Sequence, residues 1–162
     1  MNRHAQDNRR SSTPCLIKLL LSATIAALPI QVTAAIQFTD VTADSGINYV
    51  GESWGSAWGD FNDDGHPDLW TSNHNSCPSL YLNQGDGTFT DILLQVISDD
   101  LCDHTWLDSH GTAWADFDND GDQDLIQLFD QAPATATRAN RLYINNGGSL
   151  TNISSELGVD NP

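Results

Sequence analysis

The sequence GSAWGDFNDDGHPDL, residues 55 to 69, returns 56 residues later as GTAWADFDNDGDQDL, residues 111 to 125. The glycine, alanine, tryptophan, phenylalanine and leucine positions of the first copy keep this offset in the second. Internal repeats of this length are typical of architectures that stack copies of one supersecondary unit. The chain therefore contains at least two copies of one structural unit.

Each copy contains the acidic pattern D-x-[DN]-x-D-G-x-x-D. Two carboxylates about 4 Å apart repel by about 1 kcal/mol in water and about 4 kcal/mol at an effective dielectric near 20, so a converging set needs a cation. Oxygen ligands in irregular geometry favour Ca²⁺ over Mg²⁺. An acidic turn without an ion is the alternative. The predicted ligands are the side chains of Asp60, Asn62, Asp64 and Asp68 with the carbonyl of His66, and the side chains of Asp116, Asp118, Asp120 and Asp124 with the carbonyl of Asp122.

The spacing differs from that of an EF-hand, which needs a glutamate at loop position 12. That position holds Thr71 in the first copy and Gln127 in the second. The last acidic residue stands at position 9 and leads into short β-prone runs, Leu-Trp-Thr and Leu-Ile-Gln-Leu-Phe. The loops are therefore predicted to connect strands.

The first 35 residues have the features of a secretory signal peptide. Basic residues precede an apolar run at 19–30, and small residues at 32–35 offer a cleavage site. The run is shorter than the roughly 20 residues of a membrane span, although an uncleaved anchor is the alternative. Arg9-Arg10 indicates a twin-arginine signal only weakly, because polar residues follow it. A secreted, periplasmic or cell-surface protein is expected.

Cleavage would leave two basic and 21 acidic residues, a net charge of −19. Such a surface repels nucleic acid and anionic membranes. Cleavage would also remove Cys15 and leave Cys77 and Cys102, which in an exported chain predicts a disulfide. Two free thiols are the alternative.

The repeat extends beyond the acidic loop. Residues 79–92 (SLYLNQGDGTFTDI) correspond to residues 141–153 (RLYINNGGSLTNI), and residues 38–47 resemble the end of each. Their glycine-rich centres predict hairpin turns. One unit therefore reads as strand, acidic loop, strand, connection, strand, tight turn and strand, which is the content of a propeller blade.

These motifs resemble the FG-GAP/VCBS repeat of integrin-α-type β-propellers, and especially bacterial FG-GAP proteins related to cartilage acidic protein. The resemblance covers residues 38–159 and implies a propeller of seven or eight blades with calcium in the first hairpin of each blade. The fold class is then all-β: a partial β-propeller of about two four-stranded blades plus a leading strand. Closure needs at least four blades, so residues 36–162 are expected to be a fragment of a longer propeller, with self-association as the alternative.

The predicted organisation after the signal peptide (1–35) is blade one at about 51–92, an insertion at 93–110 and blade two at about 111–153. The insertion and residues 131–140 exceed a minimal blade and are predicted to be surface loops. The first contains Asp103, His104, Asp108 and His110, a possible transition-metal site for which a structural hydrogen bond is the alternative. Trp58 and Trp114 recur and favour blade packing. For the remaining tryptophans, Trp54, Trp70 and Trp106, stacking of the indole against a sugar ring is an alternative role.

No nucleophile elbow, phosphate loop or dinucleotide fingerprint occurs in the sequence, so an enzyme is not expected. The predicted function is that of a calcium-binding, non-catalytic repeat segment for adhesion or protein binding. Its partners would be a protein or glycan, further propeller repeats, or a second copy. The alternative is a carbohydrate-binding module or the scaffold of a polysaccharide-acting enzyme.

Overall fold

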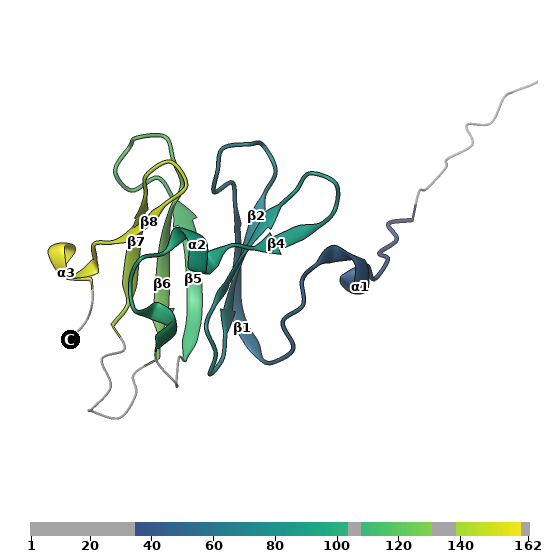
Figure 1. Cartoon of the computed structure of the whole chain (residues 1–162), viewed down its shortest axis with the longest axis horizontal. Helices are drawn as coiled ribbons and strands as arrows, with labels where there is room; N and C mark the ends of the chain where they lie inside the picture. Colours follow the sequence, from purple (N-terminus) through teal and green to yellow (C-terminus); the bar gives the residue numbers. More distant parts are fainter. Residues whose placement is uncertain (1–34, 104–107, 131–138, 160–162) are drawn as a thin grey trace, which may run out of the picture. The chain divides into compact units, whose positions relative to one another are not determined.

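The computed structural model describes residues 35–103, 108–130 and 139–159. Within the compact unit of residues 39–162, the described residues form two four-stranded antiparallel sheets (Figure 1). The remaining elements are helices of four residues and one 3-10 turn. The chain is therefore all-β, as predicted, and most of the predicted signal peptide lies outside the described residues.

The two sheets have the same construction. The first consists of β1 (Ser53–Gly59), β2 (Asp68–Asn73), β3 (Ser79–Asn83) and β4 (Phe89–Asp91), and the second of β5 (Ser109–Ala115), β6 (Asp124–Phe129), β7 (Arg141–Asn145) and β8 (Leu150–Asn152). Strands follow chain order across each sheet. This arrangement confirms the predicted order of strands and turns and is consistent with two blades of a propeller.

Each acidic loop closes the hairpin at the start of a sheet. Trp58 pairs with Leu69 in the first hairpin, and Trp114 pairs with Leu125 in the second. Loop position 4 has a left-handed backbone in both copies, at Asp63 and Asn119. The glycine at position 6 also has positive φ in both loops, a conformation that side chains disfavour. The repeated sequence thus produces the same loop twice.

The two sheets pack through β1 and β5, which lie side by side. A Cβ atom at Gly55 would collide with the carbonyl oxygen of His110, and one at Gly59 would lie 2.5 Å from the Trp114 ring. The absence of side chains at these positions therefore permits the close approach. The core between the sheets includes Trp70, Leu80, Leu93, Leu101, Leu125, Tyr143 and Leu150.

The predicted leading strand is not formed. Residues 35–41 have no strand, and Phe38 is 95% exposed. The related segments at 89–91 and 150–152 are strands because each pairs with the strand before it in its own sheet. In the described part of the chain, residues 38–40 have no such neighbour. What these three segments do share is the helical turn that follows: α1 (Thr42–Ser45), α2 (Leu93–Val96) and α3 (Ser154–Leu157).

The described part of the insertion after β4, residues 93–103, is not only a surface loop as predicted, because two of its side chains reach the core while others are exposed. It contains α2 and the 3-10 turn η1 (Leu101–Asp103), and the side chains of Leu93 and Leu101 are buried. Asp99 accepts hydrogen bonds from the Tyr143 hydroxyl (3.0 Å) and from Arg141. The insertion is therefore part of the core between the repeats. Residues 131–138 of the second predicted loop lie outside the described residues.

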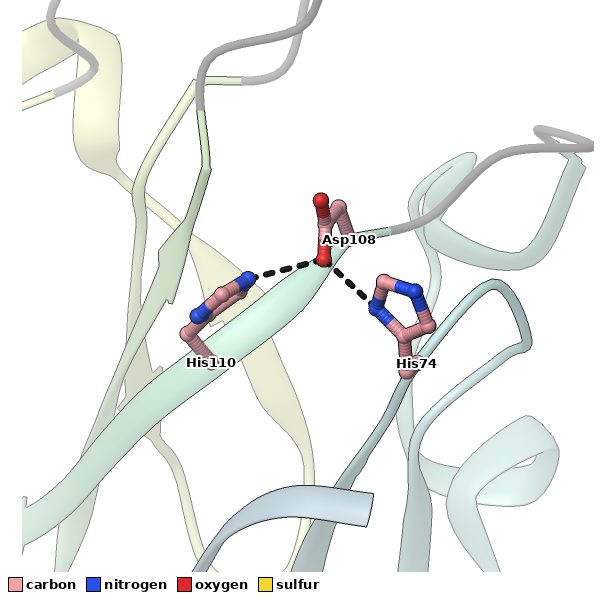
Figure 2. A group of neighbouring side chains, drawn as sticks. All are labelled: His74, Asp108 and His110. Atoms are coloured by element: carbon pink, nitrogen blue, oxygen red, sulfur yellow. Dashed lines mark hydrogen bonds and ion pairs between the residues drawn. The ribbon is translucent and has the colours of Figure 1, made fainter. Parts of the chain in front are cut away.

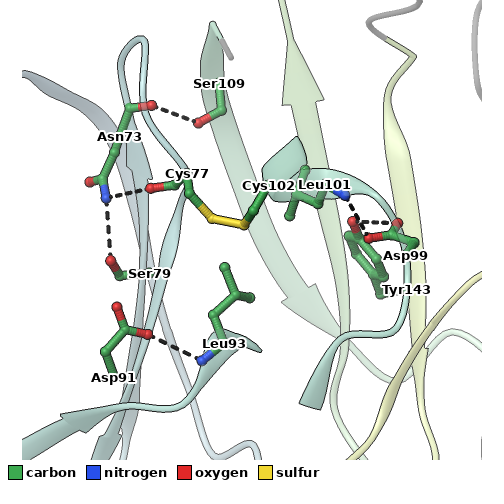
Figure 3. Close-up of a disulfide and its surroundings, with 10 residues drawn as sticks. All are labelled: Asn73, Cys77, Ser79, Asp91, Leu93, Asp99, Leu101, Cys102, Ser109 and Tyr143. Carbon is green, nitrogen blue, oxygen red and sulfur yellow. Dashed lines mark hydrogen bonds between the residues drawn. A yellow bond between two sulfur atoms is a disulfide. The ribbon is translucent and has the colours of Figure 1, made fainter. Parts of the chain in front are cut away.

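Cys77 and Cys102 form a disulfide with a Cα–Cα distance of 5.1 Å, as predicted (Figure 3). It joins the β2–β3 connection to η1 and so ties the insertion to the first sheet. In the described ranges, no helix is long and apolar enough to span a membrane.

Candidate metal sites

The second acidic loop brings three predicted ligands together. Single carboxylate oxygens of Asp116, Asp118 and Asp120 all lie within 4.8 Å of one another on an exposed loop. Asp124 is not in this group. Three negative charges this close need compensation, and their oxygens suit a hard cation such as Ca²⁺.

Backbone amides hold these carboxylates in place. Asp116 accepts hydrogen bonds from the N–H groups of Asn119 (2.6 Å) and Gly121 (3.3 Å). Asp118 accepts one from Asp120, and Asp120 accepts one from Asp122. A carboxylate has about four lone-pair positions, so these bonds leave room for a cation. The donor set of the loop therefore fits calcium.

The first loop has a similar backbone with one fewer negative charge. Asp60 accepts hydrogen bonds from the N–H groups of Asp64 (3.0 Å) and Gly65 (2.9 Å). Asp64 accepts bonds from the Asn62 side chain (2.9 Å) and the His66 N–H (2.8 Å). The hydrogen bonds from Asn62 and His66 hold the pKa of Asp64 below its ordinary value. This loop thus compensates part of its charge internally.

The residues at loop position 9 have a second role that the sequence did not reveal. Asp68 is buried and accepts hydrogen bonds from the N–H groups of Phe61 (2.8 Å) and Asn83 (2.7 Å). Asp124 is also buried and accepts the corresponding bonds from Phe117 (2.7 Å) and Asn145 (2.9 Å). Each of these carboxylates ties its loop to the third strand of its sheet. Their removal would damage the fold whether or not a metal binds.

The charges of the second loop affect one another. Loss of hydration raises the pKa of Asp118, and the hydrogen bond from the Asp120 N–H opposes this rise. The neighbouring negative charges of Asp120 and Asp124 raise the pKa further. These neighbouring negative charges favour a positive ion at the loop.

A second cluster lies where the two sheets meet at the start of β5 (Figure 2). The carboxylate of Asp108 accepts hydrogen bonds from His74 Nδ1 (2.7 Å) and His110 Nε2 (2.8 Å). Burial opposes ionisation of Asp108, but the bonds from His110 and His74 hold the pKa of this carboxyl below its ordinary value. The sequence singled out Asp108 and His110 but missed His74, which stands 34 residues before Asp108. His104 and the side chain of Asp103 lie outside the described residues.

The tryptophans have different surroundings. Trp70 is fully buried, which excludes it as a sugar-stacking surface. Trp54 stacks on His74, with ring centroids 4.0 Å apart. Trp114 is partly buried and packs between the sheets, as expected for blade packing, whereas Trp58 is exposed. Trp106 lies outside the described residues.

Comparison with known proteins finds similar sequences for the region of the two acidic loops. Residues 60–127, which contain both acidic loops, match the sequence model of the FG-GAP-like repeat. Over 91 residues the chain is 34% identical to cartilage acidic protein 1 of Xenopus tropicalis, a match that covers 56% of this chain. The corresponding proteins of Mus musculus and Homo sapiens are each 32% identical over 87 residues, or 54% of this chain.

The matched region spans 13% of the length of each of these relatives. The similarity therefore concerns the repeats and not the whole relative. It confirms the resemblance inferred from the two acidic motifs and the segments around them. The chain thus contains a segment, residues 60–127, that matches the FG-GAP-like repeat, and it is homologous over part of its length to cartilage acidic protein 1.

Proposed function

We propose that this chain is a calcium-binding, non-catalytic propeller-repeat segment of an exported protein, used for adhesion or protein binding. The observation that carries the proposal is the convergence of three carboxylates in a loop whose backbone is repeated in the other sheet. Calcium held by the side chains of the two acidic loops would remove the repulsion in each. The ion would stiffen the hairpins, and the protein-binding surface would lie on the connections between strands.

Export is supported by the disulfide, because such bonds persist in oxidising compartments and are rare in the cytosol. Calcium is also abundant outside cells, where modules that bind it with a Kd of about 10⁻⁴ to 10⁻³ M can be loaded. The chemistry of the loops and the presence of the disulfide thus favour the same location.

The outer faces of the two sheets support association with further repeats or a second copy. Trp58 and Phe117 are exposed, while their counterparts Trp114 and Phe61 contact each other across the sheets. A further repeat could therefore cover each outer face with the same kind of contact. Among the residues that the structure describes, none supports the carbohydrate-binding alternative.

Calcium titration of the purified chain by calorimetry and thermal melting tests the metal proposal. Asp116→Ala and Asp120→Ala each remove a predicted side-chain ligand, so each should abolish calcium binding at the second loop. At tenfold excess over Kd, a lost site should reduce stability by about 1.4 kcal/mol.

Asp122→Asn is the matched control. It removes a negative charge from the same loop but retains the carbonyl that is predicted to bind the ion. It also retains a side-chain oxygen that can accept the 2.9 Å hydrogen bond from Gly147. This variant should weaken binding modestly, by a contribution that salt screens. Equal loss in all three variants would indicate diffuse attraction of cations and would contradict the assigned ligands.

A further inference from the structure

We propose that His74, Asp108 and His110 form a transition-metal site of the Zn²⁺ class that joins the two repeats. The site is separate from the acidic loops and does not depend on the function proposed above. The nearest ligand atoms of the three residues all lie within 4.8 Å of one another. Figure 2 shows both imidazoles directed at the carboxylate of Asp108.

The chemistry of this donor set differs from that of the acidic loops. Two imidazole nitrogens and one carboxylate oxygen are typical ligands of Zn²⁺, whereas Ca²⁺ and Mg²⁺ prefer oxygen alone. Three protein ligands leave the fourth tetrahedral position to water. The His74, Asp108 and His110 side chains are 17%, 19% and 34% exposed, respectively. The group is therefore sheltered but open to an ion from solvent.

The ligand atoms need to move little to receive the metal. They are joined by hydrogen bonds of 2.7 and 2.8 Å. A tetrahedral zinc ion with bonds of about 2.0–2.1 Å separates its ligand atoms by about 3.3 Å. Each imidazole nitrogen would therefore move about half an ångström away from the Asp108 oxygen. The two nitrogens, which lie within 4.8 Å of each other, would settle at a similar separation. In each neutral imidazole, the proton now shared with Asp108 would move to the other nitrogen of the same ring. In a charged imidazole, this proton would be released to solvent.

The backbone around the three residues is anchored from both sheets. The His74 N–H donates to the Glu52 carbonyl (2.8 Å), and the Asp130 N–H donates to the Asp108 carbonyl (2.9 Å). His74 and Asp108 also form an isolated antiparallel bridge between the two repeats. A metal at this position would therefore cross-link the two sheets.

Two further features organise the site in advance. Trp54 stacks on the His74 ring and meets the His110 ring edge-on, with centroids 4.0 and 4.9 Å apart. The disulfide of Cys77 and Cys102 joins the two chain segments that supply His74 and Asp108. Ligands held in this way lose less freedom when a metal binds, so the aromatic contact and the disulfide both favour binding.

The cluster and the acidic loops lie at opposite ends of the same strands. Trp54 is near the start of β1 and the first acidic loop follows its end, while His110 is near the start of β5 and the second loop follows its end. Seven residues of strand span about 20 Å. Calcium and zinc can therefore be titrated separately.

The direct test is zinc titration of the full disulfide-bonded chain in excess calcium, followed by calorimetry and native mass spectrometry. The wild type should bind one equivalent of zinc. His74→Ala, His110→Ala and Asp108→Asn should each lower the affinity for zinc at least about tenfold, because each removes or weakens a ligand. Glu156→Gln removes an exposed carboxylate of α3, outside the cluster, and should leave the affinity unchanged. Absence of saturable binding in the wild type, or its retention in the His74→Ala/His110→Ala double variant, would overturn the proposal.

A measurement on the wild type alone covers the case in which a variant fails to fold. Zinc on Nδ1 of His74 leaves the ring proton on Nε2, whereas zinc on Nε2 of His110 leaves it on Nδ1. Imidazole ¹⁵N spectra should therefore show these two histidines fixed in opposite tautomers after one equivalent of zinc. Unchanged imidazole signals at both residues would reject the site.

Discussion

The two repeats share their motifs and strand order but differ in how their equivalent residues are covered. Phe61 of the first repeat is 4% exposed, whereas Phe117 at the same position of the second is 45% exposed. The tryptophans show the opposite trend: Trp58 is 58% exposed, and Trp114 packs against Phe61 with ring centroids 6.3 Å apart. At the interface between the two repeats, the first repeat therefore presents its phenylalanine and the second presents its tryptophan.

This difference shows that the stability of a repeat depends on its neighbour. In stacked repeats, the interface between neighbouring units contributes in addition to each unit's own folding. Trp114 also donates its indole N–H to the Ala57 carbonyl (3.3 Å), and the side chain of Asn145 donates to the Phe61 carbonyl (2.7 Å). Equivalent substitutions in the two repeats should therefore have unequal effects.

The largest difference is expected between Phe61→Ala and Phe117→Ala. Truncation of a buried phenylalanine typically costs about 3–5 kcal/mol, because it removes apolar contacts and leaves a cavity. Phe117→Ala should lower the free energy of unfolding by only about 1 kcal/mol, because the half-exposed Phe117 side chain buries a smaller area. Urea unfolding of both variants in calcium measures the difference. Equal costs would mean that another surface covers Phe117 in solution.

The disulfide gives a second contrast between the repeats. It ties the insertion to the first sheet, and the described part of the second repeat has no equivalent disulfide. Its cysteines are 25 residues apart in sequence. Replacing both with serine should lower the free energy of unfolding by about 3.5 kcal/mol in the chain-entropy model. Reduction of the wild type with a thiol should have a similar effect on the thermal midpoint. If neither change lowers stability, the insertion is held by Leu93, Leu101 and Asp99 alone.

The equivalent positions 71 and 127 give a third contrast. Gln127 is fully buried, and its side-chain oxygen accepts hydrogen bonds from Trp70 Nε1 and Ser72 Oγ. Gln127→Leu would leave buried donors unpaired and should cost about 2–3 kcal/mol. In the first repeat, the buried Thr71 hydroxyl has no hydrogen-bond partner among the described residues. Thr71→Val should therefore change stability by less than about 0.5 kcal/mol. Thermal melts of the two variants test this ranking. A loss of stability in Thr71→Val as large as that in Gln127→Leu would contradict it.

The sequence was sufficient to predict the features that depend on local pattern. The acidic loops, the glycine-rich turns and the strand order of each sheet follow from motifs that occur twice, with turn residues at fixed positions. The disulfide between Cys77 and Cys102 was predicted because these are the two cysteines that remain after the predicted signal peptide. These predictions needed no knowledge of which segments meet in space.

The features that were missed depend on contacts between distant segments. His74 meets Asp108 because the two sheets pack side by side, and no spacing in the sequence indicates this. Leu101 is buried because the insertion covers the second sheet, although the insertion has no repeat of its own. Residues 38–40 resemble β4 in sequence but have no strand to pair with. The sequence pattern therefore predicted the strands and turns within each repeat better than the contacts between the repeats.

The smallest expected difference concerns the acidic loops themselves. Position 3 is Asn62 in the first loop and Asp118 in the second, so the second has one more negative charge. Ligand charge is one of the properties that set calcium affinity in such loops. We expect the second loop to bind calcium about fivefold more tightly, a difference of about 1 kcal/mol.

Reciprocal substitutions test this explanation, because they exchange the charge and leave the loop backbone unchanged. Asp118→Asn should lower the affinity of the second loop to that of the first, and Asn62→Asp should raise the affinity of the first. The rise from Asn62→Asp should be smaller than the loss from Asp118→Asn, because the new carboxylate loses the amide hydrogen bond that Asn62 donates to Asp64 (2.9 Å). Calorimetric titration with calcium measures both loops separately when the affinities of the two loops differ enough. If Asp118→Asn leaves binding unchanged, calcium affinity depends on the shared backbone geometry and not on the charge at position 3.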